Sequence, residues 1–422
     1  MVYYTLIWTL CLAHVVIAAQ TLQDWLDEQE AQSPRQCDSH PEGPLWPRES
    51  NTMCPLLVDD ETAFERGSWS PWTFPPVCVE PQNESDSKLC VFTYASLRGE
   101  AGISIITTPE VAAAGIGVLE DADRRWADWA RGKPLVVSDP PPYEISDLND
   151  KGLGVVANRT IRKDEVIMVR HPVMLRIQDP KSWKLQDIMK LLHRTGLQLP
   201  LKERQQMMEL AHSKGGYILD DIMNTNSFGV LLDGVDHIGL YLDVSRINHA
   251  CRPNLFNRFS STTLAMEVVA YRDIESGEEL TFSYTPLNLL SQERQSLIRD
   301  WGFNCTCSLC ASPNDLAISD RQRGRIQDIL AELDRPDIRN HSAVQERIIE
   351  ILDLCEKEGI TAQVGDLYSI IAETYSSMKD LDMAKKYGKL AVEELRHYAG
   401  HDHERTERAL SVLNGLNRKV DA

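Results

Sequence analysis

Residues 301–310 read Trp-Gly-Phe-Asn-Cys-Thr-Cys-Ser-Leu-Cys, which places three cysteines within six residues. Thiols this close in sequence cannot easily pair with one another without strain, whereas a tetrahedral Zn²⁺ accepts four sulfurs at about 2.3 Å. The nearest earlier cysteine is Cys251, and none lies between Cys90 and Cys251. We therefore predict a structural zinc site whose ligands are Cys251, Cys305, Cys307 and Cys310. Free or disulfide-bonded cysteines are the alternative, which gains weight if the chain is secreted.

Two other polar segments are weak signals when each is taken alone. Residues 246–254, Arg-Ile-Asn-His-Ala-Cys-Arg-Pro-Asn, lie between apolar runs, where buried Asn and His side chains need hydrogen-bond partners. A ligand can supply them, although Asn-His is also a common turn dipeptide. Residues 277–284, Gly-Glu-Glu-Leu-Thr-Phe-Ser-Tyr, indicate a turn followed by a strand. A Tyr at a strand end more often belongs to a core than to a catalytic site.

Taken together and in order, five segments resemble the successive motifs of a SET domain and its post-SET cysteines. They are residues 152–154, 224–228, 248–254, 278–284 and 301–307. The resemblance extends over residues 143–311, and the shared order of five weak motifs makes it specific. It implies a protein-lysine methyltransferase that uses S-adenosylmethionine and holds a structural Zn²⁺.

Within this family the sequence is most similar to the SET and MYND domain (SMYD) type. It shares the cysteine inside the Asn-His motif, the helices inserted between strands and a helical C-terminal region. It departs from that type in one respect. The MYND zinc finger would lie between Ile177 and Asn224, where the sequence has no cysteine. Partner or DNA contacts made by that finger are therefore not expected here.

The expected fold class is α+β. Short apolar runs at 154–157 and 166–169 flank a polar turn and predict paired strands. Residues 181–223 have helical spacing, strand character returns from 227 to 284, and the chain is helical beyond Cys310. We predict a β-rich SET domain with a helical insert and a zinc-bound post-SET segment, followed by an all-α, tetratricopeptide-like C-terminal domain. The predicted boundaries are 143–285 for the SET domain, 181–223 for its insert, 286–311 for the post-SET segment and 318–422 for the helical domain.

The resemblance implies binding roles for several residues. The backbone at residues 152–154 would approach the methionine part of the cofactor, since glycine lacks the Cβ that hinders close contact. Asn226 and Asn248 would hydrogen-bond its amino and carboxylate groups. His249 would hold the adenine side through its backbone, and Phe303 would stack on the adenine ring. The implied cofactor-binding residues are Gly152, Leu153, Gly154, Asn226, Asn248, His249, Tyr284 and Phe303.

Tyr284 is the predicted catalytic residue, with its hydroxyl near the transferring methyl group, where it orients the lysine amine. A lysine with a pKa of about 10.4 must be presented neutral, at a cost of roughly 4 kcal/mol near neutral pH. A dry channel lowers this cost because desolvation favours the uncharged amine. Many SMYD-type enzymes carry a second Tyr where this sequence has Trp301, and an indole cannot accept a hydrogen bond. The number of methyl groups transferred therefore stays open.

The composition suits a globular protein with a basic partner. The 422 residues are 42% hydrophobic and 25% charged, with a formal net charge of −19. This acidity argues against general nucleic-acid binding, which needs clustered Lys and Arg. It suits a basic partner such as a Lys-rich protein tail, although acidity also keeps many proteins soluble. The family resemblance implies a lysine-containing protein substrate, such as a histone. We expect a monomer with no direct nucleic-acid contact.

The N-terminal part of the sequence indicates the secretory pathway and not the nucleus or cytoplasm. Residues 1–19 are mostly apolar and end in small residues, which predicts a signal peptide although the positive n-region is missing. We expect no membrane span after its removal, since no later segment is a convincing span. Residues 20–135 are rich in Cys, Pro and Trp. An even number of cysteines in an oxidising compartment predicts two disulfides, with three possible connectivities. The four cysteines are Cys37, Cys54, Cys78 and Cys90.

Two functions from different classes are compatible with the sequence. The first is a protein-lysine N-methyltransferase of the nucleus or cytoplasm, acting on a histone or another basic protein. The second is a catalytically weak or inactive SET-fold binding or scaffold protein of the secretory pathway or the extracellular space. N-glycosylation patterns at Asn83, Asn158 and Asn340 bear on the second. A translation start downstream of the apolar segment would reconcile the first with the N-terminal sequence.

Overall fold

A computed structural model describes residues 71–95, 97, 102–120, 140–148, 151–333 and 340–418. The chain divides into two compact units, each built from two separated stretches. Unit 1 comprises Met1–Ile116 and Pro172–Leu242, and unit 2 comprises Gly117–His171 and Asp243–Ala422. The predicted signal peptide, Cys37 and Cys54 lie outside the described residues.

Unit 1 contains a six-stranded sheet in the order β1-β2-β3-β7-β9-β8. Its strands are β1 (Val77–Val79), β2 (Leu89–Tyr94), β3 (Ile103–Thr107), β7 (Met174–Ile177), β8 (Phe228–Leu232) and β9 (Val235–Leu240). The sequences of β2 and β3, Leu-Cys-Val-Phe-Thr-Tyr and Ile-Ser-Ile-Ile-Thr, are almost wholly buried, as expected for strands covered on both faces. β3 pairs with β7 in parallel, and the other neighbours are antiparallel.

A disulfide joins the first two strands of this sheet. Cys78 of β1 lies directly opposite Cys90 of β2 in the antiparallel register, and their sulfurs are bonded. One of the predicted disulfides is therefore present in the structure. The partners of Cys37 and Cys54 stay a prediction.

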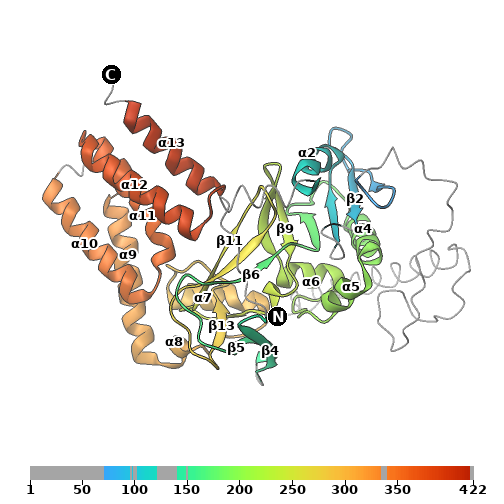
Figure 1. The fold of residues 1–422 in the computed structure, drawn as a ribbon, viewed down its shortest axis with the longest axis horizontal. Helices are drawn as coiled ribbons and strands as arrows, with labels where there is room; N and C mark the ends of the chain where they lie inside the picture. Colours follow the sequence, from blue (N-terminus) through green and yellow to red (C-terminus); the bar gives the residue numbers. More distant parts are fainter. Residues whose placement is uncertain are drawn as a thin grey trace, which may run out of the picture. The chain divides into compact units, whose positions relative to one another are not determined.

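Four helices accompany these strands in the sequence. They are α2 (Pro109–Glu120), α4 (Leu185–Gln198), α5 (Leu201–Met208) and α6 (Ile218–Asn226). Ile188, Leu191 and Leu192 form the buried face of α4, and this helix contacts β2 and β3 (Figure 1). The helices predicted between residues 181 and 223 are thus α4, α5 and α6, and their apolar spacing reflects a face that covers the sheet.

Unit 2 contains two smaller sheets, in the orders β10-β13-β5-β4 and β11-β12-β6. Their strands are β4 (Tyr143–Asp147), β5 (Leu153–Ala157), β6 (Val166–Arg170), β10 (Asn248–His249), β11 (Leu255–Phe259), β12 (Met266–Ala270) and β13 (Glu279–Phe282). The predicted pairing of 154–157 with 166–169 is wrong, because β5 pairs with β4 and β13 whereas β6 pairs with β12. The polar turn between them contacts the turn before β13 instead, through Ile161 bridged to Ile274 and Arg162 paired with Asp273.

The C-terminal part of unit 2 is helical. A short 3₁₀ segment, η2 (Val244–Arg246), lies earlier, between β9 and β10. The helical part contains α7 (Ser291–Ile298), the 3₁₀ segment η3 (Arg299–Trp301), α8 (Ser308–Ala311), α9 (Pro313–Leu333), α10 (His341–Glu358), the 3₁₀ segment η4 (Thr361–Gln363), α11 (Val364–Ser377), α12 (Leu381–Tyr398) and α13 (Glu404–Arg418). Within the predicted helical region, α11 and α12 form a hairpin in which Tyr375 stacks on Tyr387 with ring centroids 5.7 Å apart. In Figure 1 these two helices lie side by side and α13 follows α12.

The end of α12 is attached to the hairpin of β11 and β12. Arg258 donates to the backbone oxygen of His397 at 2.8 Å, and the Ser260 hydroxyl donates to the Asp402 carboxylate at 2.8 Å. Phe256 and Tyr398 add an aromatic contact at 4.8 Å between centroids. The helices are therefore fixed to the sheets of their own unit.

The α+β fold class is confirmed by these sheets and helices. The predicted domain boundaries stay predictions, and the structure adds that β1, β2 and β3 belong to the same sheet as β7, β8 and β9. Among the described residues, no helix combines the length and the apolar character that crossing a membrane requires.

Candidate active site and cysteine cluster

The Asn-His segment and the strand before Tyr284 are neighbours in unit 2. β10 and β13 run in parallel, with Asn248 opposite Thr281 and His249 opposite Phe282, and the Ala250 N–H donates to the Phe282 oxygen at 2.7 Å. The two strands are about thirty residues apart in the sequence, and they end side by side in the same sheet. The polar residues of both motifs are brought together there.

Tyr284 is held at its backbone and at its hydroxyl. Its N–H donates to Nδ1 of His249 at 3.0 Å, and its hydroxyl donates to the Ile247 backbone oxygen at 2.8 Å. Its ring centroid lies 5.4 Å from that of His249 and 5.6 Å from that of Trp301. Burial, and secondarily the charge of Glu279, raises the pKa of Tyr284 well above its usual range. The phenol is therefore neutral at physiological pH.

The strand β5 approaches Asn248 closely. The Asn248 amide donates to the Glu279 carboxylate at 3.1 Å and to the Leu153 backbone oxygen at 3.4 Å. A Cβ at Gly154 would lie 2.7 Å from the Asn248 amide nitrogen and 2.3 Å from Leu148. Gly154 is thus required for this contact, and Gly152 has φ +71°, a conformation that glycine adopts without strain.

Two large apolar side chains of unit 2 are exposed among the predicted cofactor-binding residues. Leu153 is 46% exposed and Phe303, which follows η3, is 39% exposed. Exposed Leu or Phe side chains are common on protein surfaces when they occur singly. Their exposure leaves both side chains accessible to an apolar group such as an adenine ring.

Asn226 is placed differently from the other predicted residues. It ends α6 in unit 1, where its amide donates to the backbone oxygens of Ala211 at 2.6 Å and Ile222 at 2.8 Å. The remaining predicted residues, namely Gly152, Leu153, Gly154, Asn248, His249, Tyr284 and Phe303, belong to unit 2. The role of Asn226 stays a prediction.

The four predicted zinc ligands form one cluster. Their sulfur atoms all lie within 4.8 Å of one another, with Cys251 at 3.8 Å from Cys305 and 3.6 Å from Cys310. A ZnS₄ tetrahedron with bonds of about 2.3 Å has an edge of about 3.8 Å. These separations therefore fit four ligands of one metal and are far from the 2.04 Å of the bonded pair Cys78–Cys90.

Nitrogen donors surround the sulfurs of the cluster. Gln295 donates its amide to the sulfur of Cys310 at 3.5 Å, the Cys307 N–H donates to the sulfur of Cys305 at 3.5 Å, and Nε2 of His249 lies 3.4 Å from the sulfur of Cys251. Hydrogen bonding with Cys305, and then with Cys307 and Cys310, lowers the pKa of Cys251, whereas hydrogen bonding with Cys251 raises the pKa of Cys305 and of Cys310. A metal bound by all four sulfurs would replace these shared protons, since thiolates are its ligands.

A buried ion pair lies against the same cluster. Arg323 of α9 and Glu358 of α10 are both fully buried and lie 2.9 Å apart, and Arg323 also donates to the backbone oxygen of Cys251 at 3.1 Å. Glu358 accepts further hydrogen bonds from Ser319 at 2.6 Å and Arg252 at 3.0 Å. Sequence patterns did not predict this network, because charged residues on amphipathic helices usually face solvent.

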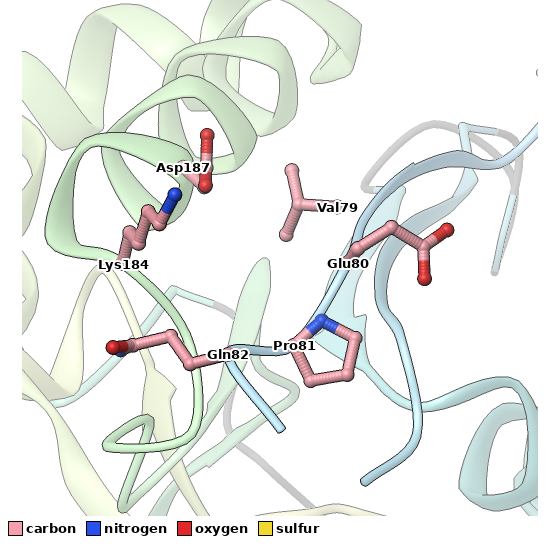
Figure 2. A pocket seen from close by; sticks show the side chains of 6 residues that line it. All are labelled: Val79, Glu80, Pro81, Gln82, Lys184 and Asp187. Carbon is pink, nitrogen blue, oxygen red and sulfur yellow. The ribbon is translucent and has the colours of Figure 1, made fainter. Parts of the chain in front are cut away.

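Unit 1 also has a shallow hollow, which is lined by residues other than the predicted site residues. Its volume is about 430 Å³. Figure 2 shows the residues that line it, on the segment that ends β1 and at the start of α4: Val79, Glu80, Pro81, Gln82, Lys184 and Asp187. It contains none of the predicted site residues, and we assign no function to it.

Comparisons with known proteins agree with the motif order. A family model described as the SET domain matches residues 152–285. Histone-lysine N-methyltransferase SET5 of Yarrowia lipolytica is 31% identical over 153 residues, which are 32% of this chain and 35% of that protein. Histone-lysine N-methyltransferase SMYD3 of Homo sapiens is 38% identical over 89 residues, 20% of each chain. N-lysine methyltransferase SMYD2 of Gallus gallus is 24% identical over 220 residues, 46% of this chain and 48% of that protein.

The similarity covers only part of each relative. The chain spans 35% of the length of the SET5 protein of Yarrowia lipolytica and 54% of that of Schizosaccharomyces pombe. The matched residues 152–285 include β5, both Asn-His residues and Tyr284. The cysteines from Cys305 to Cys310 lie beyond this range, after α7 and η3.

Proposed function

We propose that this chain, which contains a SET domain at residues 152–285, is an S-adenosylmethionine-dependent protein-lysine N-methyltransferase. The observation that carries the proposal is the meeting of Tyr284 with His249 and Ile247 inside the matched domain. The relatives above are named as histone-lysine or N-lysine methyltransferases. The substrate class is therefore a lysine-containing protein, and the net charge of −19 favours a basic one such as a histone.

S-adenosylmethionine, when bound, supplies a methyl group on a positively charged sulfur. Asn248 and the backbone at 152–154 would hold its methionine part, and the backbone of His249 and the ring of Phe303 would hold its adenosine part. The close approach of Gly154 to Asn248 and the exposure of Phe303 support this assignment. An aromatic ring left open to solvent gains buried area by stacking on adenine.

The role proposed for Tyr284 is to orient the lysine amine. Its hydroxyl proton is engaged by the Ile247 oxygen, so the phenol oxygen keeps a lone pair that can accept an N–H of the amine. An amine that has lost its proton to solvent would then have its own lone pair directed toward the methyl group that S-adenosylmethionine would supply, and the bond of that methyl group to sulfur would break as the bond to nitrogen forms. Because the pKa of Tyr284 is raised, the phenol acts by positioning and not as a base.

The cysteine cluster would hold a structural Zn²⁺. Four thiolates close a tetrahedral site and leave no position for a substrate. The metal would cross-link the residue after the Asn-His motif, Cys251, to the segment from Cys305 to Cys310. Trp301 and Phe303 lie just before this segment in the sequence. The metal would therefore also fix part of the proposed cofactor site.

Transfer of labelled methyl groups tests the proposal. The full chain is incubated with labelled S-adenosylmethionine and either histones or total cell lysate. We expect label on lysine, and a loss of roughly 100-fold in kcat for Tyr284→Phe, since a misplaced reactant has about this effect. Tyr368→Phe is the matched control, because Tyr368 of α11 also contacts another aromatic ring. It should retain the wild-type rate.

The proposal is wrong if the chain binds S-adenosylmethionine but transfers no label to any protein. It is also wrong if Tyr284→Phe and Tyr368→Phe have the same rate. The products of the active chain, separated by mass, give the number of methyl groups per lysine.

A second candidate function is favoured by one observation, the bond between Cys78 and Cys90. Disulfides persist mainly in oxidising compartments, and the acceptor Asn83 lies exposed between the two cysteines. The second proposal is therefore a SET-fold binding or scaffold protein of the secretory pathway. Mass spectrometry of the protein isolated from cells distinguishes the two candidate functions. It identifies the N terminus and shows whether Cys78 is disulfide-bonded and whether Asn83 carries a glycan. Micromolar binding of S-adenosylmethionine in a calorimetric titration counts against the second.

A further inference from the structure

The imidazole of His249 has a bonding partner at each nitrogen, and both partners belong to functional groups of unit 2. Nδ1 lies 3.0 Å from the backbone nitrogen of Tyr284, and Nε2 lies 3.4 Å from the sulfur of Cys251. The residue is 5% exposed. The role that the family resemblance implies for His249 concerns its backbone, and it leaves the side chain without a function.

The two partners determine which nitrogen carries the proton. A backbone N–H can only donate, so Nδ1 must accept and carries no hydrogen. The proton of the neutral ring is therefore on Nε2 and points at the sulfur of Cys251. A zinc-bound thiolate accepts such a hydrogen bond, and ligand partners of this kind orient the ligands of metal sites.

The ring also continues the pairing of two strands. β10 ends at His249, which lies opposite Phe282 in the parallel register. Two residues beyond Phe282, the Tyr284 N–H donates its hydrogen bond to the ring of His249 and not to a backbone oxygen of the neighbouring strand. The Tyr284 hydroxyl donates to Ile247 on the same short segment. Tyr284 is thus held at two points by residues 247–249.

We propose that the side chain of His249 is a positioning residue that joins the zinc ligand Cys251 to the strand end carrying Tyr284. Binding of the metal would then fix the Tyr284 hydroxyl as well as the post-SET segment. Trp301, the other ring in contact with Tyr284, lies four residues before the ligand Cys305. Both aromatic neighbours of Tyr284 are therefore close in sequence to a zinc ligand. The inference rests on the proposed zinc site and, for its effect on turnover, on the proposed function.

Nuclear magnetic resonance tests the hydrogen bonds without any assay of activity. The full chain is labelled with ¹⁵N-histidine and loaded with ¹¹³Cd²⁺ in place of Zn²⁺. We expect the Nε2–H tautomer for His249 and a scalar coupling between this proton and the cadmium through the sulfur of Cys251. An Nδ1–H tautomer, an imidazolium or the absence of the coupling overturns the proposal.

Two substitutions at position 249 each keep one of the two hydrogen bonds of the His249 ring and remove the other. His249→Asn keeps an acceptor near the position of Nδ1, and His249→Gln keeps a donor near that of Nε2. For His249→Asn we expect release of zinc to a chromogenic chelator to be about 10- to 100-fold faster, the usual effect of losing such a partner. For His249→Gln we expect release within threefold of wild type but a lower kcat, with KM for S-adenosylmethionine changed less than kcat.

His237→Gln is the matched control, since His237 of unit 1 is also buried and bonded at both nitrogens, to Val235 and Thr107. It should leave zinc release unchanged. Equal rates of zinc release in His249→Asn, His249→Gln and wild type overturn the proposal, as does equal loss of zinc in both variants. If the chain transfers no methyl group to any protein, the proposed function fails, whereas the zinc-release and resonance results still decide the role of His249.

Discussion

At the scale of single residues, the contact between Gly154 and Asn248 connects two motifs that are almost one hundred positions apart. The Asn248 amide reaches the backbone of β5 because position 154 has no Cβ. The amide is also engaged by Glu279, so its orientation is determined by two partners. A small change at position 154 should therefore act on Asn248 directly.

We expect Gly154→Ala to weaken binding of S-adenosylmethionine. The added methyl group meets the Asn248 amide at 2.7 Å and Leu148 at 2.3 Å, so both must move, and overpacking of this kind costs about 1–3 kcal/mol. The expected result is a rise of about 10-fold or more in the Kd measured by calorimetry. Gly229→Ala in β8 is the control, because a Cβ there meets nothing within 4 Å. An unchanged Kd for Gly154→Ala contradicts the proposed role of this contact.

At the scale of secondary-structure elements, α9 and α10 are joined by a buried ion pair and by partly exposed ones. Arg323 and Glu358 are fully buried, whereas Arg325 and Glu350 have side chains 31% and 37% exposed and lie 2.7 Å apart. Desolvation lowers the pKa of Arg323 below its usual range, with the nearby Arg294 as a second cause. The buried pair is thus sensitive to the loss of one partner.

Glu358→Leu should lower the free energy of unfolding by about 3–5 kcal/mol, because it leaves the Arg323 guanidinium buried without its carboxylate. Glu350→Leu removes the exposed pair from the same helix and should cost no more than about 1 kcal/mol. Urea denaturation measures both. The double variant Arg323→Met with Glu358→Leu should recover most of the loss. Equal losses in the two single variants would show that burial of the pair has no energetic consequence.

The elements also show what the sequence could predict. The hairpin of α11 and α12 was predictable because Leu367, Ile371 and Tyr375 recur at helical spacing and are all buried. The cysteine cluster was predictable because of its spacing, and the SET resemblance is confirmed by the family match. The sheet of unit 1 was not predicted, since the parallel pairing of β3 with β7 joins residues about seventy positions apart. Local periodicity contains no information on such a pairing.

Other parts of the candidate site were missed for a related reason. Gln295, Arg323 and Glu358 read as ordinary polar residues of amphipathic helices. Their role appears only when tertiary packing places them beside Cys251 and Cys305, with Arg323 and Glu358 fully buried. The one sequence signal for these residues was a polar side chain at a helical position that faces the core. This signal is weak when the orientation of the helix is unknown.

At the scale of the whole molecule, the two units carry different sulfur chemistry. Unit 1 contains the bonded pair Cys78–Cys90, and unit 2 contains the cluster from Cys251 to Cys310. We expect a zinc chelator to increase hydrogen exchange in peptides of α7, α8 and β10 without affecting β1 and β2. A reductant should have the opposite pattern, with a loss of about 3 kcal/mol for a loop of this length.

Hydrogen exchange followed by mass spectrometry of proteolytic peptides reads both units in one experiment. A protein treated with neither reagent is the reference. Protection of the unit 2 peptides that is unchanged by chelation, in a sample shown to contain zinc beforehand, would exclude a structural role for the metal.

The interleaved order of the units has a consequence for synthesis on the ribosome. Unit 1 can close once residue 242 has emerged, but β6 must wait roughly 100 residues for β12, and β5 longer still for β13. At about 5–20 residues per second the delay for β6 is about 5–20 s, during which two apolar strands have unpaired edges. Nascent chains stalled near residue 250 should therefore be bound by chaperones, and expression of fragments that end there should yield insoluble protein.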